Sequence, residues 1–265
     1  MEPLQDSDEM GEVGHSRRNR RYPVCIASCS DMNIEAVATD YDGTLAHDGI
    51  VDETTVAALV RAREAGLKLL MVTGRELSDL FNTFEHSSLF DVIVAENGAV
   101  LYHPTTEAVE LLAPAPPPAF IERLTNARIP LSVGHSIVAT VSPHEHEVLE
   151  AIREFQLEWH VIFNKGSVMA LPANVTKATG LGPALEAVGV LPERTAGIGD
   201  AENDQAFLRA CGLAVAVANA LPTVKELAHF VTAEAWGAGV VELIDGLLRG
   251  DVMQTRTPDN ATPTG

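Results

Sequence analysis

Two carboxylates separated by one residue, Asp40 and Asp42, follow an apolar run of strand character at residues 34–39. Ligands of open α/β sheets gather at the carboxyl ends of strands, so both carboxylates are candidates to meet one substrate there. One could act as a nucleophile and the other as a proton donor. An ordinary polar turn with the pattern Asp-x-Asp-Gly would explain the same residues if nothing else accompanied them.

Three further segments carry polar side chains at or near the starts of predicted helices. Thr73 and Gly74 end a second apolar run and open a helix, whose positive end suits phosphate. Lys177, one of only four lysines, begins a later helix. Asp200 and Asp204 lie four apart at a strand-to-helix junction, where they can present carboxylates to a hard divalent cation. Taken alone, each segment also fits an ordinary helix cap or a surface lysine. The functional interpretation therefore depends on all of the segments occurring together.

The elements that must position these residues alternate between short apolar strands and helices. The predicted strands lie at 34–39, 67–72, 92–95, 195–199, 213–217 and 230–232. The predicted helices lie at 52–65, 76–84, 177–188, 203–210, 221–229 and 238–248. This alternation predicts an α/β fold with a doubly wound parallel sheet that helices cover on both faces.

The stretch from 114 to 172 has a different pattern. It opens on a stiff proline-rich linker and continues with two similar units, each a helix followed by two strands. A shift of about 28 to 29 residues superposes the units, which indicates a duplicated αββ arrangement. We interpret 114–172 as a smaller α/β domain inserted into a core of residues 32–113 and 173–250. The strand-joining turns, with His135 in one and Asn164 and Lys165 in the other, are candidates to face the cleft, and Lys165 to bind an anionic substrate group.

Composition limits the partners of the chain. Its 265 residues contain 37 Asp+Glu and 18 Lys+Arg, a formal net charge of −19 that disfavours nucleic acid. No apolar run approaches the ~20 residues of a membrane span, and no secretory signal opens the sequence, so we expect a soluble, cytoplasmic protein. Three cysteines imply no disulfide framework. We expect residues 1–31 and 251–265 to be disordered, the former being either a natural extension or the product of a wrong start site.

In chain order, the sequence contains Asp-x-Asp-Gly-Thr at 40–44, Thr-Gly-Arg at 73–75, Lys177, and Gly-Asp-x-x-Asn-Asp at 199–204. This series resembles the haloacid dehalogenase superfamily, specifically its magnesium-dependent phosphatases. The resemblance extends from Glu35 to about Leu248, and it implies a Rossmann-like catalytic core.

The segments Glu96-Asn97-Gly98-Ala99 and 214–220 are similar to the Cof-type branch of that superfamily, subfamily IIB. Only about 30 residues separate Asp42 from Thr73, which leaves room for one helix and no inserted domain. The insert between Thr73 and Lys177 therefore resembles a C2-type cap, and its αββ repeats resemble the B subtype.

The resemblance implies a mechanism by covalent catalysis. Asp40 attacks the phosphorus atom and forms an aspartyl-phosphate, while Asp42 protonates the leaving group and later deprotonates the attacking water. Thr73, Gly74 and Lys177 hold phosphoryl oxygens, and Lys177 also offsets negative charge.

The resemblance also implies a Mg²⁺ site. Its ligands are Asp40, the backbone carbonyl of Asp42, Asp200 and Asp204, and Asn203 orients the loop beside the phosphate. A cation is needed because several carboxylates and a phosphate dianion repel one another in one cleft.

The implied function is hydrolysis of a small phosphate ester, such as a sugar phosphate or a phosphoglycolate-like compound. The compact cap resembles that of archaeal-type phosphoglycolate phosphatases. One alternative is a phosphomutase resembling phosphomannomutase, which differs in whether water reaches the aspartyl-phosphate. Another is a non-catalytic regulatory protein with this fold, which loss of a motif residue would favour, and none is lost.

Overall fold

The computed structural model describes residues 33–164 and 166–250, apart from the side chain of Asn164. The predicted disorder of residues 1–31 and 251–265, and the predicted anion contact of Lys165, lie outside the described residues. No helix among the described residues is long and apolar enough to cross a membrane.

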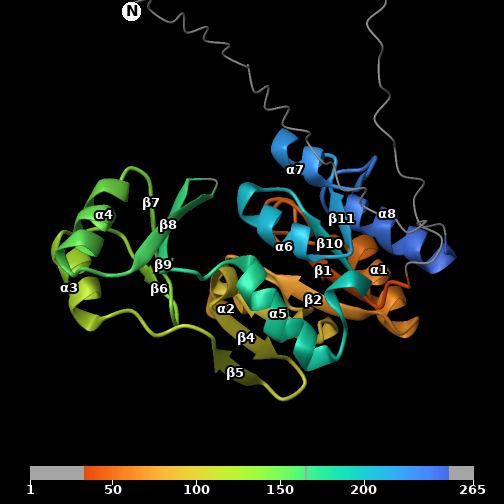
Figure 1. The fold of residues 1–265 in the computed structure, drawn as a ribbon, viewed down its shortest axis with the longest axis horizontal. Helices are drawn as coiled ribbons and strands as arrows, with labels where there is room; N and C mark the ends of the chain where they lie inside the picture. The colour runs from red at the N-terminus through yellow and green to blue at the C-terminus, as the bar shows by residue number, and fades with distance from the viewer. Residues whose placement is uncertain (1–32, 165, 251–265) are drawn as a thin grey trace, which may run out of the picture. The chain divides into compact units, whose positions relative to one another are not determined.

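The larger sheet has eight strands in the order β12-β11-β10-β1-β2-β3-β4-β5 (Figure 1). All pairs from β12 to β3 are parallel, and β4 and β5 form an antiparallel hairpin at one edge. The strands are β1 (Ala36–Thr39), β2 (Lys68–Val72), β3 (Val92–Ala95), β4 (Val100–His103), β5 (Ala108–Leu111), β10 (Thr195–Gly199), β11 (Leu213–Ala216) and β12 (Phe230–Val231). The central parallel strands are apolar and buried because helices cover both of their faces.

On one face of this sheet α1 (Glu53–Glu64) packs against α8 (Trp236–Arg249), and on the other α5 (Lys177–Val188) packs against α6 (Gln205–Ala210) (Figure 1). Two shorter helices, α2 (Leu77–Thr83) and α7 (Pro222–Leu227), complete this part. Helix α1 begins where predicted because the Asp52 side chain accepts a hydrogen bond from the Thr55 N–H. The predicted doubly wound α/β fold is confirmed.

The β4–β5 hairpin is an element that the sequence analysis did not predict. All four residues of β5 are exposed, so the strand lacks the apolar alternation that marks a half-buried strand. The hairpin leads the chain from the larger sheet into the segment that starts at Pro114.

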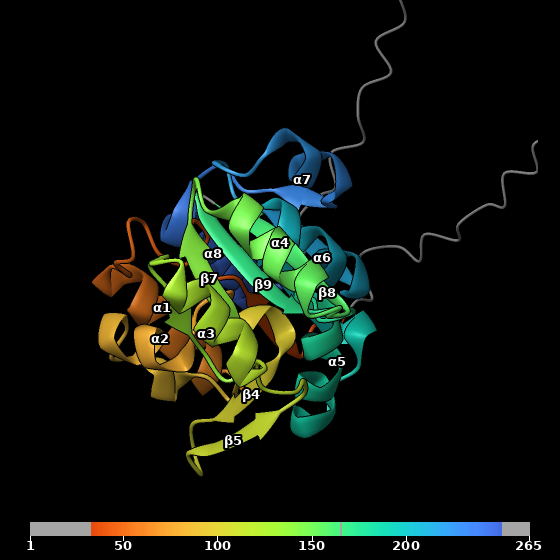
Figure 2. The same cartoon turned by 90° about the vertical axis from the view of Figure 1, so that its left-hand side faces the viewer.

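A second sheet of four antiparallel strands has the order β6-β7-β9-β8. Its strands are β6 (Ser132–Val133), β7 (Val138–Val141), β8 (Trp159–Asn164) and β9 (Ser167–Pro172). Helices α3 (Pro118–Asn126) and α4 (Glu145–Glu154) lie side by side on one face, in front of the strands in Figure 2. Their core contains Phe120, Leu124 and Val148. The order helix, strand, strand occurs twice, as the sequence analysis expected.

Side chains at the opposite face of this smaller sheet belong to the core of the larger one. Ile137, Met169 and Leu171 are buried there together with residues of β1 to β4. The two sheets therefore share apolar contacts beside the edge where β1, β2 and β3 end.

Candidate active site

The carboxyl ends of adjacent parallel strands bring the predicted residues to one edge of the larger sheet. Asp40 follows β1, Thr73 follows β2 and Asp200 follows β10. Lys177 reaches the same edge from the first turn of α5, which Thr176 caps. Parallel strands place their carboxyl ends together, so residues far apart in the sequence meet here.

Lys177 joins two of the predicted carboxylates. Its Nζ donates to Asp40 Oδ1 at 2.5 Å and to Asp204 Oδ1 at 2.6 Å, and the side chain is 2% exposed. Burial lowers the pKa of Lys177, but the carboxylates of Asp204 and Asp40 raise it further than burial lowers it. The amine therefore stays charged between the two acids.

Asp40 lies in a site with excess negative charge. The pKa of Asp40 is raised to about 8, because burial and the carboxylates of Asp204 and Asp200 together outweigh the lowering effect of Lys177. Carboxylate oxygens of Asp40, Asp200 and Asp204 lie within 4.8 Å of one another. Among the described residues, Lys177 is the ammonium group that contacts this cluster of three buried carboxylates, through Asp40 and Asp204, and oxygen donors of this kind suit a hard divalent cation. These residues fit the metal that the sequence analysis expected.

Both oxygens of Asp204 also have protein partners. Oδ1 accepts from Lys177, and Oδ2 accepts from the backbone N–H groups of Asp200 and Ala201 at 2.8 and 2.9 Å. Asp204 therefore stabilises the conformation of the loop that carries Asp200, in addition to any role as a metal ligand. Thr44 donates to Asp200 Oδ1 at 3.3 Å and connects this loop to the one that follows β1.

Arg75 holds Asp42 in a bidentate ion pair. Its Nε and Nη2 donate to the two carboxylate oxygens of Asp42, each at 2.7 Å. Arg75 also contacts Asp79 at 2.7 Å and stacks over the Tyr41 ring. The pair holds the Asp42 side chain in a fixed orientation and leaves a further lone pair on each carboxylate oxygen. The sequence analysis quoted Arg75 within a motif and gave it no role.

Three of the predicted phosphate-binding residues, Thr73, Gly74 and Asn203, lie beside Asn97, which sequence reasoning missed as a site residue. The Asn203 side chain donates to Asn97 Oδ1 at 3.0 Å, and a Cβ on Gly74 would lie 3.1 Å from Asn97 Nδ2. Buried Thr73 accepts a hydrogen bond from the Arg75 N–H at 3.1 Å through its hydroxyl. Asn97 comes just after β3 at the same sheet edge, and that position was the available signal.

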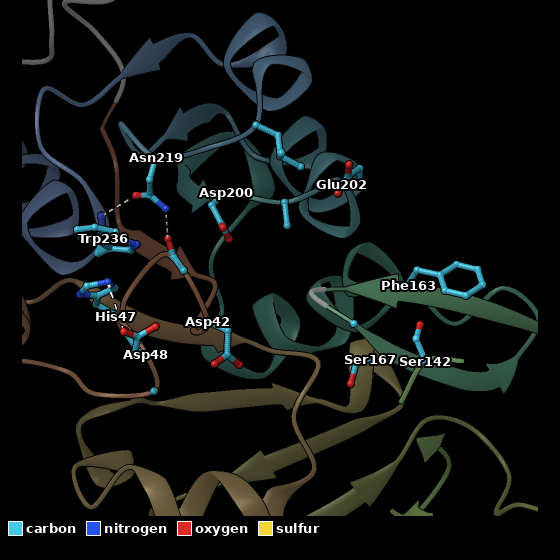
Figure 3. A pocket seen from close by; sticks show the side chains of 16 residues that line it. Asp42, His47, Asp48, Ser142, Phe163, Ser167, Asp200, Glu202, Asn219 and Trp236 are labelled. Atoms are coloured by element: carbon cyan, nitrogen blue, oxygen red, sulfur yellow. Dashed lines mark hydrogen bonds and ion pairs between the residues drawn. The ribbon is translucent and has the colours of Figure 1, made fainter. Parts of the chain in front are cut away.

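Two cavities flank Asp42. One, of about 520 Å³, lies between the charged cluster and the smaller sheet; its lining includes Asp40, Gly74, Lys177, Ile137 and Met169. The other, of about 670 Å³, is drawn in Figure 3. The site thus has room for a leaving group on either side of Asp42.

Residues from the larger sheet's active-site edge and from the smaller sheet line the larger cavity (Figure 3). Asp42 and Asp200 lie toward its centre, and Ser142 and Ser167 approach from the smaller sheet. At the other end His47 stacks on Trp236 with 3.7 Å between the ring centroids. Asn219 supports this end, because its side chain accepts from the Trp236 N–H and donates to the Gly43 carbonyl, at 2.8 and 2.7 Å.

Comparisons with known proteins agree with this geometry. The family model for haloacid dehalogenase-like hydrolases matches residues 37–125 and 135–244. A phosphoglycolate phosphatase of Methanothermobacter thermautotrophicus is 33% identical over 80% of this chain and 97% of its own. A phosphoglycolate phosphatase 2 of Saccharolobus solfataricus is 31% identical over 81% of this chain and 93% of its own.

Solved structures share the fold at lower identity. A haloacid dehalogenase-like hydrolase from Bacteroides thetaiotaomicron superposes with a TM-score of 0.69 at 18% identity, covering 80% of this chain and 98% of its own. A subclass IIB sugar phosphatase superposes with a TM-score of 0.64 at 20% identity, covering 80% of this chain and 99% of its own.

Proposed function

The chain belongs to the haloacid dehalogenase-like hydrolase family and is a phosphatase of that family, and we propose that it hydrolyses small phosphate monoesters by covalent catalysis at Asp40. The observation that supports this most is the buried cluster in which Lys177 bridges Asp40 and Asp204, with Asp42 beside it. A nucleophilic carboxylate, a fixed cation and a second, more exposed carboxylate are what phosphoryl transfer to and from an aspartate requires.

In this mechanism Asp40 attacks the phosphorus atom through a carboxylate oxygen, and the bond between phosphorus and the ester oxygen breaks. Asp42, oriented by Arg75, gives its proton to the departing alkoxide and then takes one from the water that hydrolyses the aspartyl-phosphate. Lys177, the Thr73 hydroxyl and the Gly74 N–H offset charge on the phosphoryl oxygens, since the Thr73 N–H already donates to the Val94 carbonyl.

We propose that Mg²⁺ is the resident metal. Asp40, the Asp42 backbone carbonyl and Asp200 would hold it, with Asp204 as a further predicted ligand. The metal would neutralise charge on the phosphoryl group and favour the ionised form of Asp40.

The substrate class comes from the relatives and from the insert. Relatives named phosphoglycolate phosphatases and a sugar phosphatase favour a small phosphorylated metabolite. We propose that residues 114–172 act as a cap, because side chains of the smaller sheet close one side of both cavities beside Asp42. A cap in this place encloses the leaving group and excludes bulk water.

The test is phosphate release from a panel that includes phosphoglycolate, several sugar phosphates and an aryl phosphate, with Mg²⁺ and after EDTA treatment. We expect release that depends on Mg²⁺, with one metabolite strongly preferred over the aryl phosphate. Full activity after exhaustive EDTA treatment would contradict the metal proposal. Transfer of the phosphoryl group to a second sugar phosphate, without release of inorganic phosphate, would favour a phosphomutase.

A further inference from the structure

Glu96 is a fully buried carboxylate that the proposed mechanism does not use. It follows β3 at the active-site edge and receives hydrogen bonds from the turn between β6 and β7 in the smaller sheet. The His135 N–H donates to Oε1 at 2.9 Å, and the N–H groups of Ser136 and Ile137 donate to Oε2 at 2.8 and 3.1 Å. His135 Nδ1 lies 3.1 Å from Oε1. The turn therefore wraps the carboxylate of a residue that belongs to the larger sheet.

The backbone beside Glu96 is tied to the phosphate-binding loop. The Glu96 N–H donates to the Arg75 carbonyl, and the Asn97 N–H donates to the Thr73 carbonyl, each at 3.0 Å. Glu96 and Asn97 both adopt left-handed backbone conformations, with φ of 52° and 55°. Residues without the freedom of glycine adopt such conformations only where the surroundings impose them, and such residues cluster at functional sites.

Asn97 makes a second contact between this loop and the smaller sheet. Asn97 Nδ2 lies 3.3 Å from the sulfur of Met169 on β9. Met169 and Ile137, the residue that closes the turn around Glu96, both line the cavity opposite Asp40 and Lys177. Glu96 and Asn97 thus connect the loop that binds the phosphoryl group with the residues that face the leaving group.

We propose that Glu96 is a positioning residue: by holding the turn 134–137, it fixes the smaller sheet over the phosphoryl site and so determines which leaving groups the enzyme accepts. The effect on substrate choice rests on the proposed phosphatase function. The hydrogen bonds by which Glu96 fixes the turn 134–137 do not depend on that function. Gly134 provides independent support, because a Cβ there would lie 2.6 Å from Glu96 Oε1 and 2.7 Å from Ile137 Cγ2. The turn has no room for a larger residue while the carboxylate is in place.

The experiment uses the full chain with Mg²⁺ and three variants. Glu96→Gln keeps the side-chain volume but turns an amide N–H₂ toward backbone N–H groups. Gly134→Ala crowds the carboxylate from the side of the smaller sheet and leaves Glu96 intact. Glu154→Gln is the matched control, since exposed Glu154 pairs with Arg123 on the outer helices of the same unit. Each variant is measured for kcat and KM on the best metabolite and on an aryl phosphate, and for hydrogen exchange of the peptide spanning 134–137.

For Glu96→Gln we expect the metabolite KM to rise about tenfold or more, since a buried acceptor of several hydrogen bonds is lost. We expect its kcat, and both constants for the aryl phosphate, to stay within about threefold because the phosphoryl site is untouched. The turn should exchange faster while core peptides stay protected. Gly134→Ala should change in the same direction, and Glu154→Gln should match the wild type.

Unchanged metabolite preference with unchanged exchange in the turn would overturn the proposal. Equal losses on both substrates with faster exchange throughout the core would also overturn it, because they indicate a merely structural role. If Glu96→Gln does not fold, Gly134→Ala decides by the same criteria. If the wild type releases phosphate from no substrate, the proposed function fails. In that case, unchanged hydrogen exchange of residues 134–137 in the variants would also overturn the proposal that Glu96 fixes this turn.

Discussion

At the scale of single residues, the proposed chemistry depends on keeping Asp40 ionised in a buried and crowded place. Burial and two neighbouring carboxylates oppose ionisation, and Lys177 is the one ammonium group among the described residues that contacts Asp40. A carboxylate whose pKa is about 8 is a weak nucleophile near neutral pH because much of it is protonated. The site thus needs additional positive charge to work, which is the physical case for the proposed Mg²⁺.

Replacing Asp40 with Asn should abolish turnover and change how the metal-free protein responds to pH. Between about pH 4 and pH 8, folded wild-type protein keeps a proton on Asp40 that the unfolded chain releases, so this group's stabilising contribution is lost as pH rises. Asparagine has no such proton. The melting temperature of Asp40→Asn minus that of wild type should therefore increase through this range and level off above it.

The measurement is thermal unfolding in EDTA from pH 5 to pH 9, together with phosphate release in Mg²⁺ at neutral pH. Asp48→Asn, which alters an exposed carboxylate near the site, is the control for the pH series. A difference in melting temperature that is flat with pH would contradict the buried, protonated Asp40. Turnover above about one thousandth of wild type would contradict its role as nucleophile.

The motif residues could be predicted because their spacing fixes where they lie: a polar residue directly after a buried strand must sit at the carboxyl edge of the sheet. Partnerships between side chains from distant segments could not be predicted in this way. The Arg75 pair with Asp42 joins residues 33 apart, and the Glu96 contacts join residues about 40 apart. No local periodicity encodes such pairs, because they depend on how the loops fold over the edge.

At the scale of elements, the position of Lys177 depends on close packing between α5 and the end of β3. A Cβ on Gly180 would lie 2.5 Å from Val94 Cγ1 and 2.6 Å from the Cα of Gly98. A Cβ on Gly98 would lie 2.0 Å from the Thr176 carbonyl oxygen. Two glycines therefore let the first turns of α5 approach the sheet edge closely enough for Lys177 to reach Asp40.

Gly180→Ala should destabilise the protein even though alanine favours a helix by about 1 kcal/mol. The added methyl group must displace α5 or Val94, and overpacking of this kind costs about 1–3 kcal/mol. We expect a net loss of up to about 2 kcal/mol by denaturant unfolding, and a lower kcat because Lys177 moves with the helix. A more stable variant with unchanged kcat would show that the contact between α5 and Gly98 is loose.

The central parallel strands were predicted well, whereas the β4–β5 hairpin was not predicted. Strands β1, β2, β3 and β10 are apolar runs between helices, a pattern that only a covered parallel sheet explains. Strand β5 is exposed throughout and has no such pattern. Helix α8 is assigned from Trp236, two residues before the predicted start at 238, a difference within the usual uncertainty of helix ends. The Trp236 N–H donates to Asn219, a contact between distant segments that propensity does not reveal.

At the scale of the whole described chain, the smaller sheet contributes both to stability and to the site. Ile137, Met169 and Leu171 are buried in the core of the larger sheet. Ile137 and Met169 also line the cavity beside Asp40. The proposed catalytic residues all lie outside 114–172, so we expect the proposed insert to change which substrate reacts without supplying the nucleophile or the general acid.

Replacing residues 114–172 with a short flexible linker should separate these contributions. Hydrolysis of an aryl phosphate should persist within about tenfold, because the phosphoryl site stays intact, while preference for the best metabolite should be lost. The melting temperature should fall, since three buried apolar side chains are removed and their partners in the larger sheet become exposed. In the shortened protein, Glu96→Gln should have no further effect on the ratio of metabolite to aryl phosphate kcat/KM, because the turn that Glu96 holds is gone. An additional loss of discrimination in that double variant, or full metabolite preference in the shortened protein, would show that substrate choice is made within the larger sheet itself.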